Sequence, residues 1–140
     1  ISAMPTVENP QLTLTQTNND VEIRVTYNAR FTPLERQLAG LGWHWHEHIN
    51  VFGKDATSET HLHDTDPPLF PHTRLAVTVG TVDQVIARNV AQTVTRISLN
   101  EDATAGDDDE IVCKVKIHTL DIPQEFSPEF VTPQRVLVST

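Results

Sequence analysis

Hydrophobic and polar side chains alternate along several stretches of this chain, a period of two that is typical of strands with one buried and one exposed face. The longest stretch covers residues 21–31, where Val21 and every second residue after it are apolar. Asn18-Asn19-Asp20 is a turn signal directly before it, so we expect a hairpin over residues 11–31. Residues 111–119 alternate in the same way and place Cys113 on their apolar side, where we expect a thiol buried in the core.

A short helix is expected near residues 33–39. Thr32, Pro33 and Glu35 match a capping box with proline at the first helical position. The helical period would place three leucines on the inner side of this helix, at positions 34, 38 and 41.

The remaining pattern predicts further strands, at 43–52, around 60–63, and at 74–79, 93–99 and 134–138. Residues 81–92 fit a helical stripe as well as a strand, and the pattern alone does not choose between the two. We expect the strands at 93–99 and 111–119 to form a hairpin across the acidic segment 100–110.

These elements predict an all-β fold, an antiparallel β-sandwich of immunoglobulin-like or related Greek-key architecture with about seven strands. A small closed barrel is the alternative. We expect a single domain over residues 1–140, with residues 1–9 as a loosely ordered N-terminal segment. Residues 1–3 precede Met4 and are typical of an appended remnant, although a trimmed larger parent would explain them equally.

Composition excludes several classes of protein. The 140 residues hold 10 Lys and Arg against 19 Asp and Glu, a net charge of −9 that argues against nucleic-acid binding. The chain has no glycine-rich nucleotide loop, no apolar run long enough to span a membrane and no recognisable signal segment, so we expect a soluble protein without a membrane partner. One cysteine cannot form an intrachain disulfide, and the cellular compartment stays undetermined.

Histidines in mid-chain are the main candidate for chemistry. His44, His46 and His48 are two apart, so on a strand they project from one face and two imidazoles can bind one ion. Zinc takes three or four ligands, and further ones would come from His61 and His63. These five histidines are the candidate ligands for a divalent transition metal. The alternatives are polar residues on the solvent face of a strand, or a row of imidazoles that responds to mild acid.

Glu47 is the exception on the apolar face of the same strand, which it shares with Trp43 and Trp45. A buried, unpaired carboxylate is costly, so we expect Glu47 to lie at the margin of the sheet or to pair with an arginine. The two tryptophans are expected in the core rather than on a ligand-stacking surface.

The acidic segment 100–110 is a second candidate for metal binding. Asp102, Asp107 and Asp109 offer the hard oxygen ligands that calcium prefers, but their spacing departs from that of an EF-hand. The alternative is a solvated loop whose like charges resist pairing with other chains.

No catalytic motif is recognisable in the sequence, so enzymatic activity is left open and its absence is favoured. We therefore expect a non-enzymatic binding or structural module, acting within a larger assembly or protein and without a resident cofactor. Its expected partner is another protein or a second copy of the chain. The alternative is a metal-binding protein or metalloenzyme that uses the His-x-His-x-His strand.

Overall fold

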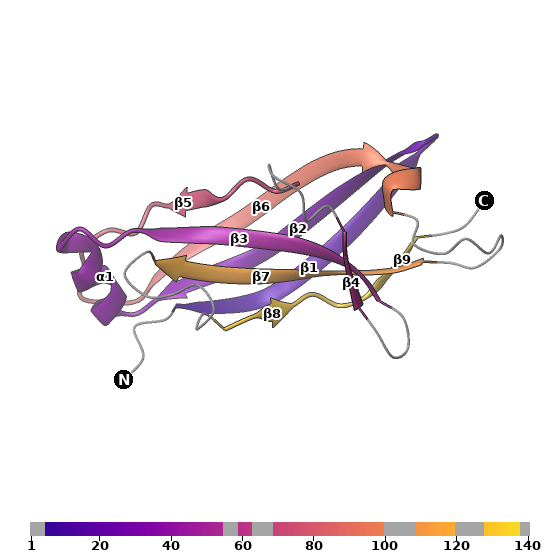
Figure 1. Cartoon of the computed structure of the whole chain (residues 1–140). Coiled ribbons are helices and arrows are strands. Elements are labelled where there is room, and N and C mark those ends of the chain that lie inside the picture. Colours follow the sequence, from indigo (N-terminus) through magenta and orange to yellow (C-terminus); the bar gives the residue numbers. More distant parts are fainter. Residues whose placement is uncertain (1–4, 55–58, 63–68, 100–108, 120–127, 138–140) are drawn as a thin grey trace.

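Two antiparallel sheets pack face to face in the computed structural model, which describes residues 5–54, 59–62, 69–99, 109–119 and 128–137 (Figure 1). The first sheet has the order β1-β2-β6, with β1 at Thr6–Thr17, β2 at Asp20–Phe31 and β6 at Gln84–Thr95. The second is centred on β3 (Trp45–Lys54) and β7 (Asp109–Thr119). Short strands flank this pair: β4 (Glu59–Leu62) and β5 (Thr73–Leu75) on β3, and β8 (Phe130–Val131) and β9 (Arg135–Leu137) on β7.

The expected all-β sandwich is confirmed. The nine described strands fill seven positions, because β3 and β7 each have two short neighbours along one edge. One short α-helix, α1 at Pro33–Gly40, lies at one end of the sandwich, and a 3-10 turn at Arg96–Leu99 follows β6. No helix in the described part of the chain is long and apolar enough to cross a membrane.

The core lies between the sheets and is built from the alternating residues that the sequence indicated. Every second side chain of β2 from Val21 to Phe31 is buried, as are Ile49 and Val51 of β3 and their counterparts on β7. Phe31 meets Trp45 edge to face across the two sheets, with ring centroids 5.9 Å apart. Cys113 is fully buried, as predicted.

The predicted hairpin and helix are both present, with one correction. The β1–β2 turn places Asn18 at φ 56°, a left-handed conformation that asparagine tolerates. The capping box forms between Thr32 and Glu35, and Glu35 is buried. The prediction that three leucines share the inner side is wrong for Leu34 and Leu41, which are exposed. Leu41 is the C-cap, beyond the helical period, and in the first turn it is Glu35 that turns inward.

The expected hairpin between residues 93–99 and 111–119 is wrong. β6 pairs with β2 from Gln84 to Thr95, whereas β7 pairs with β3, so the two strands belong to different sheets. Alternation marks a strand but does not choose its partner. The undecided segment 81–92 is strand from Gln84 onward, and β6 ends at Thr95 rather than at residue 99.

Two further segments differ from expectation. β1 begins at Thr6, inside the segment expected to be loosely ordered. The strand expected at 74–79 ends at Leu75, because Leu75 already lies opposite Trp45, the first residue of β3. Arg36 of α1 holds the chain that follows β5. Its guanidinium donates hydrogen bonds to the carbonyls of Thr78 (2.7 Å), Val79 (3.1 Å) and Val82 (2.8 Å).

Candidate functional site

Histidines from three segments meet on the outer face of the second sheet. His46 of β3 lies opposite His118 of β7 on one side and opposite Arg74 of β5 on the other. Directly opposed residues of antiparallel strands point to the same face. His72 directly precedes β5 and joins them there, next to His48. We call His46, His48, His72 and His118 the histidine cluster.

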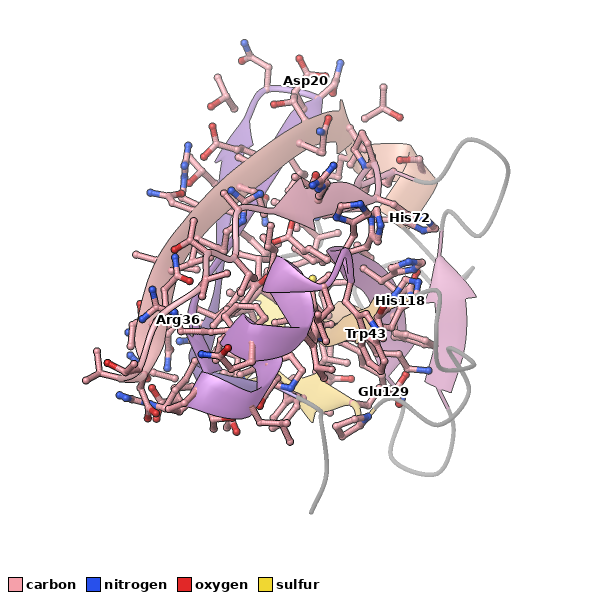
Figure 2. All side chains as sticks on the ribbon, turned by 90° about the vertical axis from the view of Figure 1, so that its left-hand side faces the viewer. Asp20, Arg36, Trp43, His72, His118 and Glu129 are labelled. Atoms are coloured by element: carbon pink, nitrogen blue, oxygen red, sulfur yellow. The ribbon has the colours of Figure 1, made fainter. Side chains whose placement is uncertain are left out.

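The rings of the histidine cluster are in close contact. The centroid of His48 lies 3.3 Å from that of His72 and 4.0 Å from that of His118, and His46 lies 5.9 Å from His118. His48 is only 4% exposed and His118 only 6%, so the solvent-facing alternative is wrong for His48. Figure 2 shows His72 and His118 together on the side of the molecule away from β6.

Burial and neighbouring cations favour the uncharged form of His46, His48 and His118. Loss of solvation is the main cause that lowers the pKa of His46, His48 and His118, and for His48 the pKa falls to about 3. Mutual repulsion among the imidazoles adds to this, as do Arg74 beside His46 and Lys116 beside His48 and His118. On the same strand, Lys114 and Lys116 lie 3.9 and 3.7 Å from the carboxylate of Glu129.

The rings of the cluster pack against one another rather than around an ion: His48 and His72 are tilted by 32°, and His48 and His118 meet edge to face at 71°. Imidazoles bound to one zinc ion radiate from it, which keeps their ring centroids roughly 5 Å apart. Two of the three observed separations are shorter, and the described residues contain no group of three or more His, Cys, Asp or Glu that could hold a metal. Nδ1 of His118 is buried and has no hydrogen-bond partner among the described residues.

Of the five histidines that the sequence indicated as candidate ligands, the described residues place His46 and His48 in the cluster. His44 precedes β3 and is exposed. His61 lies on β4 opposite Phe52, where only its backbone is described, and His63 lies outside the described residues. Among the calcium candidates, Asp102 and Asp107 lie outside the described residues, and Asp109 opens β7 with its side chain outside them.

His72 and His118 were missed as members of the cluster. His118 continues the polar side of residues 111–119, after Lys114 and Lys116, so its face was readable from the sequence. The pairing of β7 with β3 was not readable, and this pairing sets His118 beside His46.

The opposite face of β3 holds a buried ion pair inside the core. Arg88 of β6 donates to Glu47 through Nε and Nη2, at 2.9 and 3.1 Å, and the Tyr27 hydroxyl donates to the same carboxylate at 2.6 Å. The arginine partner expected for Glu47 is therefore confirmed. Tyr27 and Arg88 are directly opposed on β2 and β6, so this triad ties the first sheet to the second.

The two edge strands of the first sheet differ sharply. The β1 edge is interrupted by Pro10 and by a register shift between Glu8 and Gln11, and Arg135 of β9 donates to its Leu12 carbonyl at 2.9 Å. Proline and bulges are devices that stop an edge from pairing with other chains.

Within the part of the chain that the structure describes, β6 has none of these devices. It pairs with β2 over all twelve residues without a register shift, and no described strand pairs with its other edge. Its sequence has no proline or glycine. The single charge, on Arg88, is turned inward and bonded to Glu47.

Comparisons with family models, curated proteins and solved structures give no match to this chain. The histidine cluster and the β6 edge therefore have to be judged on their own chemistry.

Proposed function

We propose that this protein is a non-enzymatic β-sandwich binding module that takes up an extended polypeptide strand along the edge of β6. The observation that carries the proposal is the contrast between the two edges of one sheet. β1 is interrupted by a register shift and its Leu12 carbonyl accepts a hydrogen bond from Arg135, while β6 is regular and without a described strand on its outer side. An added strand gains main-chain hydrogen bonds along such an edge, and alternate side chains supply specificity.

The strand order supports an immunoglobulin-like or related Greek-key topology for this module. We letter the strands in chain order and leave out strand D, so that β1, β2 and β3 are A, B and C, and β6 and β7 are E and F. With β4 and β5 sharing position C′ and β8 and β9 sharing position G, the sheets have the orders A-B-E and C′-C-F-G. In this lettering β6 is strand E at the end of its sheet, and the end position makes its outer edge available to a partner. Fold alone does not assign function, so the proposal rests on the edge itself.

A peptide with the sequence of residues 84–95 provides a probe strand. We expect saturable binding to dilute protein by fluorescence anisotropy, together with slower exchange of the β6 amides that point away from β2. The matched control is the same peptide N-methylated at alternate residues, which removes the donors on one edge and leaves the side chains in place. Equal binding of both peptides, or of neither, would refute strand addition at β6.

A second candidate, a transition-metal-binding protein, is favoured by one observation. The histidine cluster brings four imidazoles together, and one buried nitrogen of His118 has no described partner. Metal ligation would require the closely packed rings to move apart. Elemental analysis of tag-free protein, with melting in the presence and absence of chelator, tests it. Stoichiometric zinc, copper or nickel and a chelator-sensitive melting temperature support this candidate, and trace metal with an unchanged melting temperature contradicts it.

A further inference from the structure

We propose that the occupant of the β6 edge is a second copy of this chain, with two β6 strands paired antiparallel across a twofold axis so that the three-stranded sheets join into one. The inference rests on the proposed strand addition at β6 and names its partner. A twofold interface uses the same surface on both copies, so the surface must complement itself.

The pleat of the strand limits where the axis can lie. Directly opposed residues of an antiparallel pair must point to the same face of the sheet. If the twofold axis, perpendicular to the sheet, passed midway between two residues of one strand, inward side chains would lie opposite outward ones. Pairing of all twelve residues end to end would place the axis midway between Asn89 and Val90, so this register is excluded. The axis must therefore pass through a residue, which at the middle of the strand is Asn89 or Val90.

From Val85 to Thr93, the outward residues of β6 have a similar order in both directions about Asn89. The outward residues of the strand are, in order, Val85, Ala87, Asn89, Ala91, Thr93 and Thr95. With the axis at Asn89, each Ala87 lies opposite the Ala91 of the other copy, and each Val85 lies opposite a Thr93, which pairs two β-branched side chains. The β-branched pair suits a pleated sheet, whereas the pairing of two alanines is neutral. This near-palindrome favours a second copy over an unrelated strand.

Charge also favours self-pairing at this edge rather than elsewhere. The protein carries a net charge of −9, so most encounters between two copies are repulsive. No charged side chain of β6 itself projects outward, and Arg88 points inward with its charge paired to Glu47. The guanidinium of Arg24 on β2 reaches the Asn89 side chain at 2.6 Å, and it is paired with Glu22. Val85 is 46% exposed and Val82, just before the strand, is 67% exposed, which adds apolar surface at the end of β6.

The test is the mass of the full chain in solution and its response to two pairs of lysines. Sedimentation equilibrium from about 1 µM to about 500 µM is expected to show a rise from 15.7 kDa towards twice that value. Ala87→Lys with Ala91→Lys puts like charges opposite each other and is expected to raise the dimer dissociation constant about tenfold. The matched control is Thr13→Lys with Thr15→Lys, which adds the same charge to exposed positions of β1 and is expected to leave the constant unchanged.

A cysteine cross-link reports where the axis lies. With the axis at Asn89, Asn89→Cys forms a disulfide-linked dimer on oxidation, because the two new thiols face each other. With the axis at Val90, the link forms instead in a mixture of Asn89→Cys and Ala91→Cys. The exposed Thr13→Cys is the control, and native Cys113 is buried in every variant.

The outcomes separate the two proposals. A dimer weakened at Ala87 and Ala91 but not at Thr13 and Thr15, in variants that melt as the parent does, supports pairing through β6. A dimer that ignores both pairs of lysines overturns the inference. A chain that stays monomeric yet binds the strand peptide overturns the second copy and leaves strand addition standing. A monomer that does not bind the peptide overturns both.

Discussion

Glu47 and Arg88 join the two sheets through a two-bonded ion pair inside the sandwich. The guanidinium Nε and Nη2 of Arg88 lie 2.9 and 3.1 Å from the two carboxylate oxygens, and the Glu47 side chain is only 3% exposed. Such a pair specifies how the sheets align, because a displaced register would leave a charge buried without a partner. The relationship also turns the only charge of β6 away from its open edge.

Removing one member of this pair should destabilise the fold strongly. We expect Arg88→Ala to lower the free energy of unfolding by about 3 kcal/mol or more, because the carboxylate of Glu47 stays buried. Urea unfolding measures the loss. The control is Arg24→Ala, which breaks a more exposed pair with Glu22 and should cost much less. Equal losses in the two variants would show that Glu47 gains solvent when Arg88 is absent.

The Tyr27 hydroxyl is the third member of the triad, and its loss should be measurable alone. Tyr27→Phe removes the 2.6 Å hydrogen bond to Glu47 and is expected to cost about 1.5 to 3 kcal/mol, the usual range for a bond to a charged group. Burial, reinforced by the neighbouring carboxylate, raises the pKa of Tyr27. An absorbance titration should therefore show no phenolate until the protein unfolds. Phenolate formation in the native protein at about pH 10 would contradict this environment.

Gly80 and Arg36 should be coupled. A Cβ at position 80 would collide with the Arg36 guanidinium, which would have to leave the carbonyls that it holds. We expect Gly80→Ala to cost about 1 to 3 kcal/mol through the loss of those bonds. The same substitution should cost far less in an Arg36→Ala background, which a double-mutant cycle by urea unfolding measures. Additive losses would argue against the coupling.

Mild acid should destabilise the fold through the histidine cluster. The pKa of His46, His48 and His118 is lowered, so the unfolded chain binds protons that the folded one does not. The stability of the neutral cluster is fully present above about pH 6.5 and is lost as the pH falls, by up to about 1.4 kcal/mol per pH unit for each histidine. Unfolding by urea between about pH 7 and pH 5, with chelator present, measures the slope.

Two substitutions test whether the histidine cluster causes this change of the free energy of unfolding with pH. His48→Gln and His118→Gln should each flatten it, because one acceptor of protons in the unfolded state is lost. His44→Gln, at an exposed position before β3, is the comparison variant and should change the slope less, because it leaves the buried imidazoles in place and removes only one neighbour whose charge lowers the pKa of His46. If both cluster variants kept the pH dependence of the parent protein, residues outside the cluster would be the cause of the acid sensitivity.

Cys113 should be unreactive in the folded protein. It lies fully buried on β7, and desolvation raises the pKa of its thiol to about 12. We expect a disulfide reagent to label it at the rate at which the protein unfolds, so labelling should accelerate in parallel with added urea. Stoichiometric labelling within seconds in native buffer would contradict this burial.

Local pattern was enough to find most elements of the fold. The alternation from Val21 to Phe31 marks β2 because a two-layer sandwich buries one face of each long strand, and the Thr32 to Glu35 box marks α1 because it satisfies its own backbone donors. The helical stripe at residues 81–92 was ambiguous for a related reason. β6 is an edge strand with half-buried inner residues, which weakens its period of two.

The histidine cluster was only partly accessible from the sequence. Spacing placed His46 and His48 on one face of a strand, as observed. The spacing did not predict that His118, seventy residues after His48, or His72, in the segment before β5, would join them. Contacts of such separation depend on strand register, and the sequence carries no local signal for register.

The sequence by itself determined the all-β class, the faces of the long strands, the capped helix and the buried thiol, because each follows from local periodicity or local hydrogen bonding. The tertiary structure alone decided that β6 pairs with β2 rather than β7, that Arg88 meets Glu47, and that four histidines gather outside the core. It also decided which edge stays open. These are properties of how strands are paired, and pairing energies are summed over the whole sheet rather than stored in any one segment.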